Sequence, residues 1–122
     1  MDNQKFSVYS RLKSFKYAFS GLAVLFKEEH NALIHLVAAL VAFVCGLFYS
    51  ISAVEWIAVI FCIGIVFASE IFNSSIERIC NIISPEKSEK IKHIKDLSAA
   101  AVLVSAITAF LTGLIIFIPK IF

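Results

Sequence analysis

Two long apolar segments without a formal charge place the strongest constraint on how this chain folds. In residues 31–50 only His35 can gain a charge near neutral pH, and residues 97–118 contain no charged side chain. Each segment supplies the roughly 20 apolar residues that a helix needs to cross about 30 Å of hydrocarbon. We therefore predict a transmembrane helix over each segment.

The composition of the chain agrees with a membrane protein. Of the 122 residues, 60% are hydrophobic and 16% are charged, whereas soluble domains have about 25% charged residues. This balance excludes an ordinary soluble enzyme. Two prolines and four glycines leave little to interrupt long helices, whereas a β-barrel needs short alternating segments separated by turn residues.

A third apolar segment, residues 53–83, carries charge within it. Fourteen uncharged residues separate Glu55 from Glu70. At about 1.5 Å per residue, the two carboxylates lie about 22 Å apart along a helix, which is less than the hydrocarbon thickness. At least one of them therefore lies at or inside the membrane boundary. We predict a transmembrane helix that continues into the cytoplasm.

Residues 7–27 have a different pattern, in which basic side chains alternate with a stripe of apolar ones, namely Phe15, Phe19, Leu22 and Phe26. This pattern is typical of an amphipathic helix that lies in the membrane interface. The predicted fold is an all-α membrane protein with three transmembrane helices plus an N-terminal amphipathic interfacial helix, in a single domain over residues 1–122.

Lysine and arginine are divided unevenly between the two ends of the predicted spans. Ten of the eleven precede the first span or lie between the second and third, and only Lys120 follows the third. Because Lys and Arg accumulate in cytoplasmic loops, we expect the N-terminus and the second connection to face the cytoplasm. Because membrane orientation explains the distribution of the basic residues, we predict no nucleic-acid partner.

Polar side chains line one face of residues 53–83 at the predicted cytoplasmic boundary. Glu70, Asn73 and Glu77 have the spacing i, i+3 and i+7, which places them on the same helical face. A charge at such a depth costs a few kcal/mol, and an ionisable residue there indicates a functional site.

Charged residues precede the other two spans at the same level: Glu28, Glu29, Lys95 and Asp96. Carboxylates beside lysines suit a Mg²⁺ nucleotide, because Mg²⁺ takes one or two protein carboxylates together with phosphate oxygens. The four glycines are isolated and form no phosphate-binding loop. Any nucleotide site is therefore unconventional.

Other interpretations of these charged and polar residues stay open at this point. Glu70 and Glu77 could simply form ion pairs with Arg78 or nearby lysines at the interface. The chain could also be a small oligomeric transporter or cation-binding protein that uses the Glu70 and Glu77 face, although a transporter places its carboxylates near the bilayer midplane. A structural membrane adaptor without chemistry is the third alternative.

The run EIFNSSIE at residues 70–77, followed after 17 residues by KDLSAAAVL from Lys95, resembles the signature of one family. It is the small prokaryotic integral-membrane diacylglycerol kinase and undecaprenol kinase family. The likeness covers nearly the whole chain, from residues 14–18 and Gly21 to the third span. Asn31 and the pair Ile34-His35 look more like the undecaprenol kinase branch.

The resemblance implies an ATP-dependent lipid kinase of the bacterial cytoplasmic membrane that phosphorylates the hydroxyl of undecaprenol or diacylglycerol. It also implies a homotrimer whose active sites are shared between neighbours. Glu70 would take the proton from the lipid hydroxyl and Asn73 would orient the reacting groups. Glu29 and Glu77 would bind Mg²⁺ together with the phosphates of ATP.

The implied nucleotide contacts are Tyr17, Glu29, Glu77, Glu86, Lys87, Ser88, Lys95 and Asp96. The candidate lipid contacts are Glu70, Asn31, His35 and Ser98, with helix packing as the alternative role for the last two. Two positions depart from the family pattern, because Asn81 stands where Asp is frequent and Ser88 where His is frequent. These departures leave the nucleotide contacts of that loop open.

Overall fold

The computed structural model describes residues 6–84, 86 and 88–122, and these residues form four helices and no strand. The helices are α1 (Val8–Glu28), α2 (His30–Phe48), α3 (Ala53–Ile83) and α4 (Glu89–Ile121). Three of them, α2, α3 and α4, are long and apolar enough to cross a membrane. The predicted all-α class with three membrane helices is confirmed.

Helix α4 is longer than the uncharged segment at its centre. It begins at Glu89, eight residues before Leu97, and it ends at Ile121, beyond Pro119. The extra N-terminal residues include glutamate and lysines, which are good helix formers and can extend a helix into water. Pro119 lies in the last turn, where the loss of one backbone donor disrupts little of the helix.

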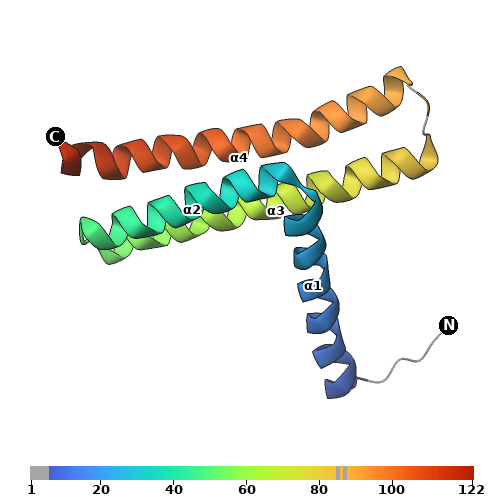
Figure 1. The fold of residues 1–122 in the computed structure, drawn as a ribbon, viewed down its shortest axis with the longest axis horizontal. Helices are drawn as coiled ribbons and strands as arrows, with labels where there is room; N and C mark the ends of the chain where they lie inside the picture. The colour runs from blue at the N-terminus through green and yellow to red at the C-terminus, as the bar shows by residue number, and fades with distance from the viewer. Residues whose placement is uncertain (1–5, 85, 87) are drawn as a thin grey trace.

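The four helices are arranged as a bundle of three with one helix set across it. Figure 1 shows α2, α3 and α4 running side by side, while α1 leaves the bundle steeply at the beginning of α2. Only Glu29 separates α1 from α2, and its extended backbone makes the corner. A helix set across the spans in this way can lie along the membrane surface, as an interfacial helix does.

The turn between α2 and α3 closes the end of the bundle opposite to α1. Ser52 and Glu55 form a reciprocal capping box, in which each side chain accepts a hydrogen bond from the backbone N–H of the other, at 3.2 and 2.9 Å. Glu55 Oε2 also lies 3.2 Å from Lys120 Nζ at the end of α4. The charge of Glu55 is therefore used to cap α3 and to connect it to α4.

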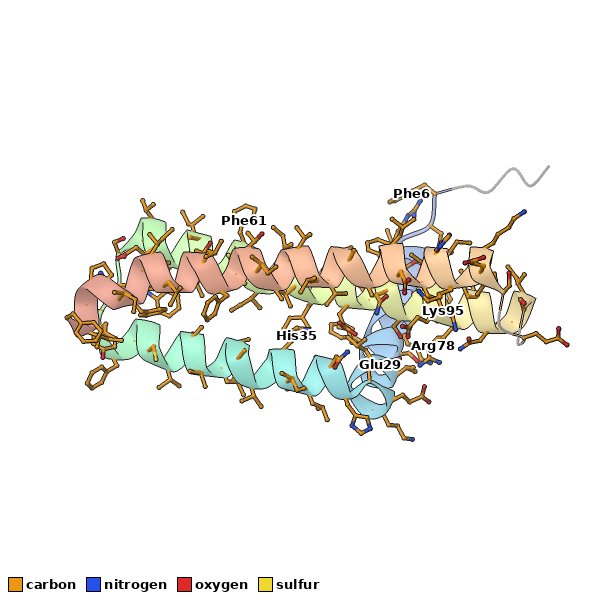
Figure 2. The ribbon with its side chains drawn as sticks, turned by 90° about the horizontal axis from the view of Figure 1, so that it is seen from above. Phe6, Glu29, His35, Phe61, Arg78 and Lys95 are labelled. Atoms are coloured by element: carbon orange, nitrogen blue, oxygen red, sulfur yellow. The ribbon has the colours of Figure 1, made fainter. Side chains whose placement is uncertain are left out.

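The buried apolar core lies at the same end of the bundle. Ile51, Val59 and Ile116 form its centre, and Trp56 and Tyr49 pack against them. Most other large apolar side chains on α2, α3 and α4 are exposed, including Phe61 in Figure 2. An apolar surface of this extent suits lipid or neighbouring copies rather than water.

Gly46 lets α2 approach Trp56 closely. A Cβ atom at Gly46 would lie 2.6 Å from Trp56 Cη2 and 3.2 Å from Ile51 Cδ1. We expect Gly46→Ala to destabilise the protein by about 1–3 kcal/mol, because overpacking moves the Trp56 ring. The thermal midpoint in detergent measures this loss.

The matched control is Gly64→Ala in α3, where, apart from the adjoining residues and the backbone of the same helix, no described atom lies within 4 Å of the added methyl group. This variant should unfold at or above the wild-type temperature, because alanine favours helix over glycine. Equal midpoints for the two variants would contradict the role assigned to Gly46.

Candidate functional site

The candidate site begins with a row of buried polar side chains on α3. Glu70, Asn73 and Ser74 are all buried, and Glu77 is half-buried one turn further along the same face. At this level α1 and α2 meet at their corner and pack beside α3. Figure 2 shows Glu29, Arg78 and Lys95 gathered at this end of the bundle.

Glu70 is the most deeply buried large side chain among the described residues, with 1% of its surface exposed. Its Oε2 atom has no hydrogen-bond partner in the described part of the chain and lies 3.6 Å from His35 Nε2 on α2. Removing a carboxylate from water without hydrogen bonds is costly, so such groups call for a functional explanation. Such an environment is expected of a general base whose hydrogen-bond partner is the substrate itself.

Two further polar atoms in the described residues are buried without a partner, Asn73 Oδ1 and Ser98 Oγ. They come from α3 and α4, so both helices contribute unsatisfied groups to this part of the bundle. Together with Glu70 they leave hydrogen-bonding capacity that a bound substrate can use.

Arg78 joins the α1–α2 corner to α3. Its Nη2 atom donates a 2.6 Å hydrogen bond to Glu28 Oε2 and lies 3.6 Å from Glu29 Oε1. Ser74 Oγ donates to Glu29 Oε1 at 2.8 Å. The hydrogen bond and the charge of Arg78 hold the pKa of Glu28 below its ordinary value.

The arginine therefore has partners other than those considered from the sequence. Among the described residues its ion pairs are with Glu28 and Glu29, not with Glu70 or Glu77. The sequence reasoning missed Ser74 as a site residue and gave Arg78 no place in the site. Both stand four residues apart on the same face as Glu70, and following that face through every i+4 position would have found them.

Glu29 and Glu77 are the candidate magnesium ligands. Glu29 makes the corner between α1 and α2, and Glu77 lies on α3 seven residues beyond Glu70. No group of three or more His, Cys, Asp or Glu side chains within residues 6–84, 86 and 88–122 could hold a metal ion. Two carboxylates fit Mg²⁺ that arrives with phosphates, because phosphate oxygens and water complete its coordination.

A second polar region lies at the connection between α3 and α4. A pocket of about 530 Å³ is lined by Ser84, Glu86, Ser88, Glu89, Ile91, Lys92, Lys95 and Asp96. Four of these residues were predicted to contact the nucleotide. Lys95 Nζ donates a 2.7 Å hydrogen bond to Asn81 Oδ1, so the asparagine that departs from the family pattern anchors a predicted nucleotide contact. Lys87 lies outside the described residues.

Two residues that were predicted to contact the substrates lie apart from the other site residues. Tyr17 on α1 is 66% exposed, and Asn31 is exposed at the start of α2. Neither forms a side-chain hydrogen bond or an ion pair with another described residue. Within one chain the structure thus assembles the α3 face, the α1–α2 corner and the α3–α4 pocket, but not these two side chains.

His35 also lines an apolar cavity between the three long helices. The cavity has a volume of about 290 Å³, and its wall is formed mainly by small or apolar side chains such as Ala39, Val66, Ala109 and Gly113. His35 therefore stands between this cavity and the buried carboxylate of Glu70.

Comparison with known proteins shows which family this sequence is similar to. The profile of the family described as prokaryotic diacylglycerol kinase matches residues 16–117. An undecaprenol kinase of Bacillus subtilis is 34% identical over 108 residues, which cover 88% of each chain. A diacylglycerol kinase of Escherichia coli K12 is 30% identical over 105 residues, which cover 86% of each chain.

Replacing Arg78 with alanine tests the connection between the corner and α3. We expect the pKa of Glu28 to rise toward its ordinary value, because the guanidinium that lowers it is gone. Since the folded-state pKa lies below the unfolded one, the contact stabilises the fold above the ordinary pKa. That stabilisation is lost as the pH falls through the lowered value.

Nuclear magnetic resonance titration of isotope-labelled glutamate carboxylates in detergent micelles measures this shift. The control is Arg78→Lys, which keeps the positive charge and should raise the pKa less than alanine does. A Glu28 pKa that is the same in Arg78→Ala and wild type would rule out the contact.

Proposed function

Because this chain belongs to the prokaryotic diacylglycerol kinase family and is a lipid kinase, we propose that it transfers the γ-phosphoryl group of ATP to a membrane lipid. The acceptor we propose is undecaprenol, with diacylglycerol as the second candidate. The undecaprenol kinase of B. subtilis shares the higher identity of the two relatives, and Asn31 with Ile34-His35 looks more like that branch.

The observation that supports this function best is the fully buried carboxylate of Glu70 in α3, where the apolar part of that helix gives way to a polar face. We assign Glu70 as the general base. It accepts the proton of the lipid hydroxyl while the hydroxyl oxygen bonds to the γ-phosphorus and the bond to the bridging oxygen of ADP breaks. Asn73, whose Oδ1 has no hydrogen-bond partner among the described residues, orients the reacting groups.

We place the phosphates of ATP closer to water than Glu70, beside Glu77. Glu77 lies about 10 Å beyond Glu70 along α3, on the side from which a soluble nucleotide arrives. Glu29 and Glu77 would hold Mg²⁺ with the phosphates, where the cation neutralises phosphate charge. Lys95 adds positive charge to the α3–α4 pocket, and Asp96, Glu86 and Ser88 offer polar contacts for the rest of the nucleotide.

We further propose that the active protein is a homotrimer with its N-terminus in the cytoplasm. The exposed apolar surface of the three spans supports association with other copies. Tyr17 and Asn31, which one chain does not join to the site, would then meet the site of a neighbour. The excess of basic residues at the end that carries the site supports its cytoplasmic orientation.

The transporter interpretation has no remaining support. Neither the family nor the names of the two relatives points to transport. Glu29 lies at the α1–α2 corner and Glu77 lies on α3 beyond Glu70, on the side of the α3–α4 connection, whereas a coupling-ion site belongs near the bilayer midplane.

The first test is transfer of labelled γ-phosphate from Mg²⁺-ATP to undecaprenol and, separately, to diacylglycerol in mixed micelles. We expect phosphorylation of undecaprenol at the higher kcat/KM. Glu70→Gln should lower kcat by about 10²–10⁴-fold, because the amide cannot accept the proton. Folded wild-type protein that phosphorylates neither lipid would overturn the proposed activity.

A second test separates the magnesium ligands from the base. Glu29→Gln and Glu77→Gln should each raise the Mg²⁺ concentration for half-maximal activity by about tenfold or more, since loss of even an outer-shell group costs that much. Glu55→Gln, at the opposite end of α3, is the matched control and should leave the Mg²⁺ requirement unchanged. An unaltered requirement in both site variants would remove them as ligands.

A further inference from the structure

The contacts described so far do not fix the orientation of the Glu70 carboxylate. Its side chain has three rotatable bonds, and a base must direct one carboxylate oxygen at the hydroxyl that it deprotonates. In the described part of the chain, Oε2 has no hydrogen bond and the side chain is sealed from water. A group that fixes the carboxylate must therefore come from a neighbouring side chain.

His35 is the neighbour in position to do this. Its Nε2 atom lies 3.6 Å from Oε2 of Glu70, and this is the one ion-pair contact of Glu70 among residues 6–84, 86 and 88–122. The histidine comes from α2 and the glutamate from α3, so the contact lies between the two helices. Only 18% of the His35 side chain is exposed.

Apart from Glu70, the described side chains around the His35 ring are mainly apolar. His35 also lines the apolar cavity between α2, α3 and α4. Among the described residues that line this cavity, Thr112 alone carries a hydroxyl, and its Oγ1 already donates a 2.8 Å hydrogen bond to the carbonyl of Thr108. An imidazole placed among alanine, valine and phenylalanine side chains thus directs its Nε2 at the carboxylate.

We propose that His35 is a positioning residue for Glu70, holding Oε2 through Nε2–H so that Oε1 meets the acceptor hydroxyl. This inference rests on the proposed kinase function. Catalytic hydrogen bonds are often long before substrate binds and shorten in the complex, so a 3.6 Å separation is compatible with this role. Phosphoryl transfer depends mainly on positioning, and a displacement of about 1 Å can cost about 10²-fold in rate.

This role differs in its kinetics from a direct contact with the lipid. A residue that contacts the acceptor chain contributes to binding in the ground state, and its loss raises the lipid KM. A residue that aligns the base acts on the chemical step, and its loss lowers kcat while the lipid KM stays unchanged.

The test compares two substitutions of similar size in the full-length protein, reconstituted in mixed micelles with Mg²⁺-ATP and undecaprenol. His35→Leu removes the donor and suits the apolar cavity, whereas His35→Gln keeps an N–H donor. We expect His35→Leu to lower kcat about 10²-fold with the lipid KM within twofold of wild type. His35→Gln should recover most of that loss.

The same two substitutions are then made in Glu70→Gln. If His35 acts only through the carboxylate, neither one lowers the residual rate of Glu70→Gln further. His30→Ala, at the exposed start of the same helix, is the control for loss of a histidine and should retain wild-type kcat and KM.

Three outcomes would overturn the proposal while the wild type remains active. One is a raised lipid KM with unchanged kcat in His35→Leu, which would make His35 a lipid contact. The others are equal rates for the leucine and glutamine variants, and a full additional loss in Glu70→Gln. Inactivity of the wild type would instead count against the proposed kinase function, so the two failures are distinguishable.

Discussion

The bilayer interior offers no hydrogen bonds, and the placement of every polar group in this chain follows from that constraint. Helices satisfy the backbone, and the few charged side chains are moved to the two ends of the bundle. At one end Glu55 is fully used by the Ser52 cap and Lys120. Further along α3, Glu70 is buried with an oxygen left unsatisfied by the described residues. The same physical cost is thus relieved at Glu55 and retained at Glu70.

The two polar regions near the α1–α2 corner are linked by a single helix. Helix α3 carries the buried Glu70 and continues without a break to the pocket that begins at Ser84. A kinase acting on a membrane lipid must bring an apolar acceptor and a soluble nucleotide together. A rigid helix that crosses the interface holds both halves of the site at a fixed separation.

Much of this architecture could be predicted from the sequence, because span length and the i, i+3, i+7 spacing are local properties. The membrane helices and the shared face of Glu70, Asn73 and Glu77 are of this kind. Contacts between helices are not local. The bonds from Ser74 to Glu29 and from Lys95 to Asn81 depend on how α3 rotates against its neighbours. The capping box of Glu55 is itself a local pattern, Ser52-x-x-Glu55, and it explains the position of this carboxylate without a role in chemistry.

The location of the apolar core has a consequence for how the molecule can move. Ile51, Val59, Ile116 and the Trp56 contact with Gly46 lie at the closed end of the bundle, far from the candidate site. The helices are held by apolar packing at that end, whereas polar contacts such as Arg78 to Glu28 and Lys95 to Asn81 hold them near the candidate site. Polar contacts can exchange partners without opening the apolar core, so a rearrangement beside Glu70 leaves that core in place.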